Sequence, residues 1–143
     1  EEIAEVMRAQ AQESAVKITT RLEASLPPIQ ADPDQLRQLF LNLVANAIEA
    51  MPGGGEVGLE TRSSGEGHRR IIARVVDTGP GIPPATLPHI FDLFFSTKER
   101  GLGLGLAIVK RIVEEHRGTI QCHSQEGNGT TFDVMLARAH ADL

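Results

Sequence analysis

Two asparagines, Asn42 and Asn46, stand four residues apart in a segment whose apolar residues recur at helical spacing. Residues at i and i+4 share one face of a helix, and Gln38 and Glu49 extend this polar stripe in both directions. Leucines flank the stripe, so we expect a half-buried face. Amide groups there can bind phosphate oxygens and a hydrated magnesium ion, which keeps several waters and needs few protein ligands. Amides on a solvated helix surface are the alternative interpretation.

Asp77 ends an apolar segment and precedes the turn Thr78-Gly79-Pro80-Gly81. An ionised carboxylate only accepts hydrogen bonds, which suits the exocyclic amine of adenine, the donor that distinguishes adenine from guanine. Gly79 and Gly81 let the backbone approach a flat base closely. An Asx-type turn at the end of a strand is the alternative interpretation, because such turns are common.

Three glycines, Gly101, Gly103 and Gly105, alternate with Leu102 and Leu104 and lead into a predicted helix. The backbone N–H groups and the positive dipole end at a helix start favour phosphate. Glycines also permit a loop that folds over a ligand and reopens, although a hinge without a ligand has the same composition. The spacing differs from the dinucleotide-binding fingerprint, and the Lys-Ser/Thr pair of the P-loop is missing.

The segment before these glycines holds aromatic and basic residues. We expect Phe91 and Phe94 to pack a mobile segment onto the core, although ordinary core aromatics are an equal interpretation. Lys98 and Arg100 can pair with phosphate when the loop closes, or stay solvated. A fourth motif, Gly127-Asn128-Gly129-Thr130, forms the turn of a closing hairpin. The order and spacing of all four motifs predict an ATP pocket, because a random chain rarely supplies every part.

Composition narrows the function classes. The chain has 143 residues, 41% of them hydrophobic, which predicts one domain with a sizeable core. The formal net charge of -5 disfavours a nucleic-acid partner. The single Cys122 rules out an internal disulfide and a cysteine-built metal site, which fits a reducing compartment. The five histidines have no metal-ligand spacing, and we interpret His116 as a residue that compensates a helix dipole.

Periodicity and turn residues predict the elements that must position these groups. Helices are expected at 1–14, from an N-cap at Asp32 to just before Pro52, and at 104–115, where Gly118 ends the last one. A short helical piece is expected at 87–91. Strands are expected at 16–23, 57–61, 69–76, 119–124 and 130–136, and the last two form a hairpin.

These motifs resemble the catalytic, ATP-binding domain of bacterial two-component sensor histidine kinases, in particular the nitrogen-regulation type. The likeness runs from about Val16 to Leu136. It implies a two-layer α/β (α+β) sandwich, in which a mixed, mostly antiparallel sheet of about five strands packs on three helices beside a mobile ATP lid. Residues 15–143 are then the catalytic domain, and residues 1–14 the end of a linker helix from a missing upstream dimerisation and phosphoacceptor domain.

The resemblance also implies roles for individual residues. Asn42 and Asn46 match the N box, which implies a catalytic role for both and a magnesium-ligand role for Asn46. Asp77 is implied to hydrogen-bond the adenine amine. The other implied ATP-contacting residues lie in the glycine boxes, the F box and the lid: Gly79, Gly81, Phe94, Lys98, Arg100, Gly101, Leu102, Gly103, Leu104, Gly105 and Thr130.

Two positions depart from the family pattern. Leu102 stands where the family usually has threonine, and Glu49 stands where many members have a basic residue that helps to hold phosphate. Lys98 and Arg100 are then expected to carry more of the phosphate-binding role.

The resemblance implies the cofactors ATP and Mg²⁺ and transfer of the γ-phosphoryl group to a histidine outside this chain, because none of the five histidines has the acceptor context. The implied partners are the upstream domain of a homodimeric parent and a response regulator, with no nucleic acid. The fragment itself is expected to be monomeric. It is expected to be cytoplasmic, in a parent that is either cytoplasmic or anchored in the inner membrane. A serine kinase or ATPase of the same superfamily and a nucleotide-sensing module without transfer chemistry are the alternatives.

Overall fold

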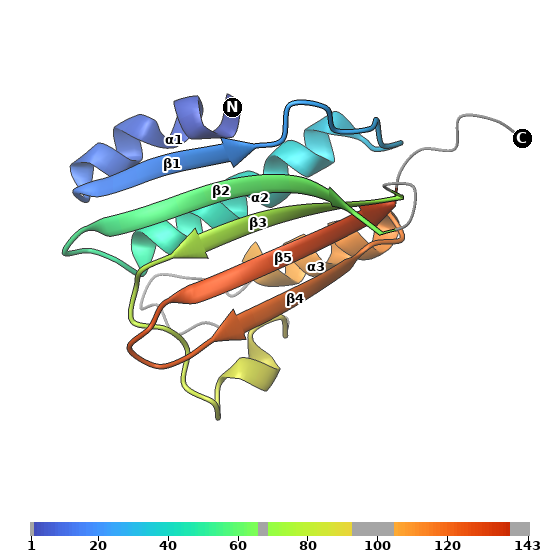
Figure 1. The fold of residues 1–143 in the computed structure, drawn as a ribbon. Coiled ribbons are helices and arrows are strands. Elements are labelled where there is room, and N and C mark those ends of the chain that lie inside the picture. The colour runs from blue at the N-terminus through green and yellow to red at the C-terminus, as the bar shows by residue number, and fades with distance from the viewer. Residues whose placement is uncertain (1, 66–68, 93–104, 138–143) are drawn as a thin grey trace, which may run out of the picture.

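The computed structural model, which describes residues 2–65, 69–92 and 105–137, contains one mixed sheet with strand order β1-β2-β3-β5-β4 (Figure 1). Only β1 and β2 pair in parallel; the remaining neighbours in the described sheet are antiparallel. The strands are β1 (Val16–Leu22), β2 (Gly55–Ser64), β3 (Arg70–Asp77), β4 (Thr119–Ser124) and β5 (Thr130–Ala137). The helices are α1 (Glu2–Glu13), α2 (Pro33–Glu49) and α3 (Gly105–Glu115), with a 3-10 turn, η2 (Leu87–His89). The predicted two-layer sandwich is confirmed.

The core lies between the helices and one face of the sheet (Figure 1). Leu39 and Leu43 of α2 stand one helical turn apart and are fully buried against the sheet. Val57 of β2 and Val134 of β5 meet them from the strands, with Val109 of α3 beside them. Alternation along each strand thus directs one set of side chains inward, and the opposite face carries polar residues together with apolar ones such as Ile72 and Met135.

The start of α2 is as predicted. Asp32 caps the helix: its Oδ1 accepts hydrogen bonds from the backbone N–H groups of Asp34 at 2.9 Å and Gln35 at 3.3 Å. Pro33 occupies the first turn, where its missing N–H leaves no hydrogen bond unmade. The helix ends at Glu49, shortly before Pro52.

Two element bounds were predicted wrongly. β2 spans Gly55–Ser64 and is longer than the predicted 57–61, because Gly55 already pairs with Val16 of β1 in a parallel ladder that local propensity does not reveal. The helical piece expected at 87–91 is only the single 3-10 turn Leu87–His89.

Gly118 was predicted to end α3, but the residue that adopts the left-handed conformation there is Arg117. Arg117 adopts φ +57°, a position usually taken by glycine, and its N–H bonds to the carbonyl of Glu114 at 3.0 Å. The Gly118 N–H reaches back to the carbonyl of Val113 at 2.9 Å, so the two residues form a Schellman motif. Gly118 is needed for another reason, since a Cβ at this position would collide with the Met135 carbonyl of β5.

His116 joins the end of α3 to the start of α2. Its Nε2 accepts a hydrogen bond from the Asp32 backbone N–H at 3.1 Å, and its Nδ1 lies 2.8 Å from the Ile112 carbonyl, to which it donates. The donation to a carbonyl in the last turn of α3 fits the predicted dipole-compensating role. The second hydrogen bond shows that His116 also holds two helix ends together.

α1 packs into the same core as the rest of the chain. Ala4, Met7 and Ala11 lie one turn apart and are buried against β1 and α2. An upstream domain before this helix stays a prediction. Among the described helices, none has the length and apolarity needed to cross a membrane.

Candidate nucleotide-binding site

Asp77 lies at the end of β3, between Val57 of β2 and Thr130 of β5. Its Oδ1 accepts a hydrogen bond from the Gly79 backbone N–H at 2.9 Å. Burial raises the pKa of this carboxyl, while hydrogen bonds from the backbone of Gly79 and Thr130 act in the opposite direction. The Asx-type turn considered from the sequence is thus present. It uses one carboxylate oxygen, and Oδ2 has acceptor capacity for a ligand.

The C-terminal end of α2 is tied to the turn that follows Asp77. The Thr78 hydroxyl lies 3.7 Å from the Met51 sulfur and 3.0 Å from the Glu56 backbone nitrogen, which donates to it. A Cβ on Gly79 would come within 3.1 Å of Met51 Cγ, so glycine lets the turn lie directly on this side chain. Met51 therefore forms a floor beside Asp77.

This attachment brings the amide stripe of α2 to the same end of the sandwich as Asp77. Asn46 precedes Met51 by five residues, about 7 Å along a helix axis. Asn42 lies one turn further back, and its Nδ2 is buried without a hydrogen-bond partner among the described residues. Buried amide donors are normally satisfied, so this atom is available to a bound acceptor such as a phosphate oxygen.

The first turn of α3 lies beside the same stretch of α2. α3 runs antiparallel to α2, because His116 at its end meets Asp32 at the start of α2 (Figure 1). An 11-residue helix is about 16 Å long, which sets Gly105 level with the second half of α2. The structure therefore gathers Asp77, the asparagine stripe and the N-terminal end of α3 at one end of the molecule.

The turn between β4 and β5 supports the loop after Asp77. Gly127 donates its N–H to the Pro80 carbonyl at 2.6 Å, and Ile82 donates its N–H to the Ser124 hydroxyl at 2.7 Å. Gly81 adopts φ +76°, and a Cβ there would collide with the Gln125 carbonyl. Close approach of Gly81 to this turn thus explains the glycine without reference to a base.

Thr130 is a buried neighbour of Asp77, as the predicted site requires, and its hydroxyl lies 3.0 Å from that of Ser124. Phe91 packs edge-on against Phe132, with ring centres 6.2 Å apart, which confirms its contact with the core. Lys110 Nζ lies 5.9 Å from the centre of the Phe91 ring. The remaining predicted residues of the loop lie outside the described part of the chain: Phe94, Lys98, Arg100, Gly101, Leu102, Gly103 and Leu104.

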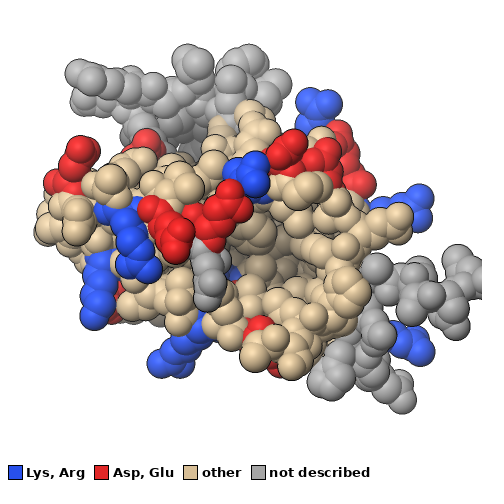
Figure 2. All heavy atoms as spheres, turned by 90° about the horizontal axis from the view of Figure 1, so that it is seen from above, with Lys and Arg blue, Asp and Glu red and all other residues tan. Residues whose placement is uncertain are grey.

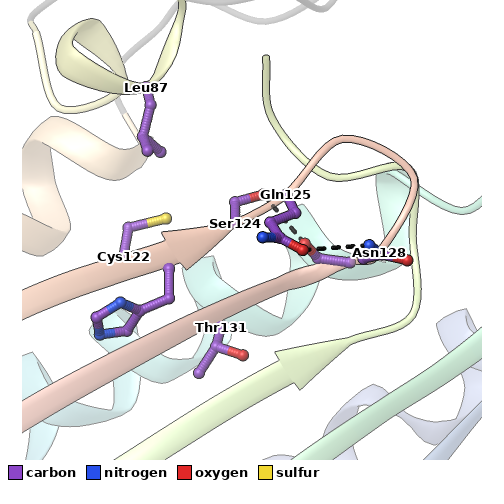
Figure 3. A pocket seen from close by; sticks show the side chains of 8 residues that line it. Leu87, Cys122, Ser124, Gln125, Asn128 and Thr131 are labelled. Carbon is purple, nitrogen blue, oxygen red and sulfur yellow. Dashed lines mark hydrogen bonds between the residues drawn. The ribbon is translucent and has the colours of Figure 1, made fainter. Parts of the chain in front are cut away.

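A separate hollow of about 480 Å³ runs along β4 and the β4–β5 turn (Figure 3). Leu87 of η2 points across it toward Cys122, and Gln125 and Asn128 close its far end. Burial, and then the negative charge of Asp77, raise the pKa of the Cys122 thiol to about 12, so it stays protonated. None of the asparagines of α2 lines this hollow, but its lining residue Gly129 lies against the Asp77 backbone, so the hollow adjoins the Asp77 side of the predicted nucleotide site.

Three residues of this region were missed from the sequence: Met51, Thr78 and Ser124. Thr78 stands inside a recognised motif, but its bonds to Glu56 and Met51 depend on segments far apart in the chain. Ser124 ends an edge strand and binds Ile82 and Gly129 through its hydroxyl, which no local pattern signals.

Comparison with known proteins decides the family. A family model described as histidine kinase-, DNA gyrase B- and HSP90-like ATPase matches residues 31–140. The chain belongs to this family. It is 45% identical over 134 residues to the sensory histidine kinase/phosphatase NtrB of Rhizobium meliloti, covering 85% of this chain and 35% of that protein. It is 49% identical over 112 residues to the sensor histidine kinase ZraS of Escherichia coli, covering 78% of this chain and 23% of that protein.

Solved structures agree with these relatives. Full-length ShkA in complex with AMPPNP superimposes with a TM-score of 0.84 at 35% identity, over 99% of this chain and 30% of that one. The catalytic domain of histidine kinase ThkA gives a TM-score of 0.82 at 27% identity, over 96% of this chain and 90% of that one. The predicted histidine-kinase catalytic domain of nitrogen-regulation type is confirmed, as is ATP as its nucleotide. The chain spans about a third or less of the curated relatives it matches.

Proposed function

We propose that this domain binds Mg-ATP and transfers the γ-phosphoryl group to a histidine on a separate dimerisation domain. The observation that carries the proposal is the convergence of Asp77, the asparagine stripe of α2 and the first turn of α3 at one end of the sandwich. The relatives NtrB and ZraS are named as sensor histidine kinases, and both are much longer than this chain. The partners in this proposal are a dimerisation and phosphoacceptor domain in a longer parent and a response regulator as a separate protein.

Each group has a distinct task in this proposal. Asp77 accepts a hydrogen bond from the adenine amine, and the raised pKa caused by burial reflects a carboxylate that lacks water and gains from such a donor. The first turn of α3 faces the phosphates with N–H groups and a positive dipole end. Thr130 and Met51 shape the wall and floor next to Asp77.

In this proposal, amide groups of the site would hold magnesium, and a cluster of carboxylates would not. No group of three or more His, Cys, Asp or Glu side chains suited to a metal occurs among the described residues. Mg²⁺ retains several waters and takes further oxygens from the phosphates, so a single amide oxygen from Asn46 suffices. The orphaned Nδ2 of Asn42 is a donor and serves a phosphate oxygen. The ion neutralises charge on the transferring group.

In the transfer step, the bond between the γ-phosphorus and the bridging oxygen of ADP breaks, and a bond to the acceptor imidazole nitrogen forms. The imidazole releases its N–H proton to solvent, and ADP leaves with the electron pair of the broken bond on its terminal oxygen. The domain holds and aims the phosphoryl group, which is the main demand in such reactions. Asn42 is an amide and cannot act as a general base for water, so we expect slow ATP hydrolysis by the isolated chain.

A labelling experiment tests this proposal. The chain is mixed with [γ-³²P]ATP, Mg²⁺ and the dimerisation domain of its own parent, and acid-labile label on that domain's histidine is measured. Asp77→Asn is expected to weaken ATP binding by about tenfold or more, since hydrogen bonds to charged groups contribute about 1.5–3 kcal/mol. The matched control is Asp34→Asn, which removes a carboxylate that is 86% exposed on the first turn of α2.

Three outcomes contradict specific parts of the proposal. ATP binding without label on histidine favours a nucleotide-sensing module. Label on a serine of the partner favours the serine-kinase alternative. Unchanged ATP affinity in Asp77→Asn contradicts the adenine assignment.

A further inference from the structure

A second cavity, of about 260 Å³, lies between the helices and the sheet, and Asp77 is not among the residues that line it. Ile3 of α1 and Leu36 and Phe40 of α2 form its helical wall. Leu59 of β2 and Ile71 and Val75 of β3 form its sheet wall.

The cavity and the nucleotide site are lined by different residues. Ile71 stands six residues from Asp77 on β3, about 20 Å at the rise of a strand, and Val75, the lining residue nearest to Asp77 along this strand, stands two residues from it, about 7 Å. The two sites also use different parts of α2. Leu36 and Phe40, which line the cavity, belong to the first half of the helix, and Asn46 belongs to the second. None of the residues assigned to the nucleotide site lines the cavity, so the two sites share no side chain.

The walls offer a ligand almost no polar partner. Arg74 reaches the lining, but its guanidinium forms a two-bond ion pair with Asp133, at 2.7 and 3.1 Å, on strand β5. The Thr61 hydroxyl accepts a hydrogen bond from the Glu23 backbone N–H at 3.2 Å. Glu60 also lines the cavity, directly opposite Arg74 in the β2–β3 ladder. The Arg74 guanidinium and the Thr61 hydroxyl are thus already paired, and because the remaining lining residues are apolar, an ionised ligand would lose its hydration with little compensation.

The mouth of the cavity is also apolar. Residues 24–31 cross it without forming a helix or strand, and Leu26, Pro27 and Ile29 of this segment face the cavity. Leu22, at the end of β1, is 37% exposed beside them, which is unusual for a large apolar side chain of this domain. Figure 2, which looks down on the molecule from above, shows a hollow surrounded mostly by residues other than lysine, arginine, aspartate and glutamate.

The size of the cavity sets the size of its ligand. An apolar cavity of about 150 Å³ stays dry and holds a benzene molecule. The present cavity is larger and has a mouth through which a ligand can enter. We propose that it binds a small uncharged apolar molecule, such as a substituted single aromatic ring or a short branched hydrocarbon chain.

Toluene and benzoate are the probes, because they share a ring and differ in charge. Binding is followed by methyl-resolved NMR of the chain with labelled Ile, Leu and Val. Saturable shifts are expected with toluene at about millimolar concentration, at the methyl groups of Ile3, Leu59 and Ile71, and none with benzoate. AMPPNP with Mg²⁺ is expected to leave the toluene affinity unchanged. Shifts centred on the β4–β5 hollow, equal binding of benzoate, or displacement of toluene by AMPPNP would overturn the proposal.

Two variants test the location from different sides. Ala73→Leu fills the cavity from β3, and Ile29→Trp fills its mouth from the loop, so each is expected to weaken toluene binding by about tenfold or more. The control is Val6→Trp, since Val6 is 57% exposed on α1 and does not line the cavity. If Ala73→Leu fails to fold by circular dichroism, Ile29→Trp decides alone. Wild-type toluene affinity in a folded filling variant rules the site out.

Discussion

Asp77 experiences two opposing influences on its carboxyl group. Burial raises its pKa above the ordinary value of 3.8, and backbone hydrogen bonds from Gly79 and Thr130 counteract part of that rise. A group whose pKa is higher in the folded protein stabilises the fold fully below its unfolded pKa, and this contribution is lost as pH rises through the folded pKa. At neutral pH the ionised Asp77 carboxylate therefore lowers the stability of the fold, and in the proposed complex an adenine amine would supply a further hydrogen-bond donor.

The first prediction concerns this pH dependence. Asp77→Asn removes the ionisable group, so the free energy of unfolding of the variant, relative to wild type, is expected to increase from about pH 3 to about pH 7. Urea unfolding without nucleotide measures the difference at each pH, and Asp34→Asn serves as the exposed-carboxylate control. A relative stability that falls with rising pH contradicts the burial effect assigned to Asp77.

A second prediction at the residue scale concerns Asn46 and magnesium. In wild type, chelation of Mg²⁺ is expected to weaken ATP binding, because under the proposed function Asn46 would hold the ion and the ion would neutralise phosphate charge. Asn46→Ala is expected to lose about tenfold or more of this magnesium-dependent affinity, since even residues that only support a metal ligand affect metal binding by about 10–100-fold. Calorimetry with and without EDTA gives the ratio. Asn128→Ala, whose side chain bonds Gln125 at 3.2 Å, is the control, and an unchanged ratio in Asn46→Ala excludes Asn46 as the ligand.

Secondary elements were largely predictable because their signals are local. Asp32 followed by Pro33 marks the start of α2, and the structure shows this cap. Tertiary contacts explain the errors: Gly55 joins β2 because β1 lies beside it, and Arg117 takes the left-handed conformation because Gly118 must pass close to Met135. At the site, Asp77 and Asn46 stand in recognisable motifs. Met51 and Ser124 were not predictable, since only folding brings them next to Gly79 and Ile82.

His116 connects the end of α3 to the start of α2. The third prediction concerns the removal of its side chain. His116→Ala removes the bonds to the Asp32 N–H and the Ile112 carbonyl and is expected to cost about 1 kcal/mol of unfolding free energy, because the exposed N–H can turn to water. The urea midpoint measures this loss. His123→Ala, at an exposed position of β4, is the control. Equal midpoints for both variants argue against the helix-joining role.

The fourth prediction separates backbone conformation from close packing. Gly81 and Gly127 have φ values of +76° and +86°, but only a Cβ on Gly81 meets the Gln125 carbonyl. Gly127→Ala is expected to cost about 1–2 kcal/mol of stability for its left-handed conformation. Gly81→Ala is expected to cost more and also to weaken ATP binding, because the loop that carries Gly79 must shift. Thermal unfolding and nucleotide titration test both, and equal losses in the two variants rule out the packing explanation.

At the scale of the whole molecule, antiparallel α2 and α3 give the sandwich two unlike ends. The C-terminal end of α2 and the first turn of α3 meet Asp77 at one end, where the nucleotide is proposed to bind. The first half of α2, toward the other end, lines the apolar cavity. Both ends share one core, and α1 contributes to it through Ala4, Met7 and Ala11.

This shared core leads to the fifth prediction, which concerns the extent of the folding unit. Met7 is 6% exposed and Val6 is 57% exposed on neighbouring positions of α1. If α1 is part of the domain, Met7→Ala leaves a cavity in the common core and is expected to lower the unfolding free energy of the entire chain by about 2–5 kcal/mol. Val6→Ala is expected to change it by about 0.5 kcal/mol or less. Urea unfolding followed by circular dichroism and by methyl NMR of β5 measures both variants. A loss confined to α1, with β5 unfolding at its wild-type midpoint, means that the helix is a separate linker and that the domain begins at β1.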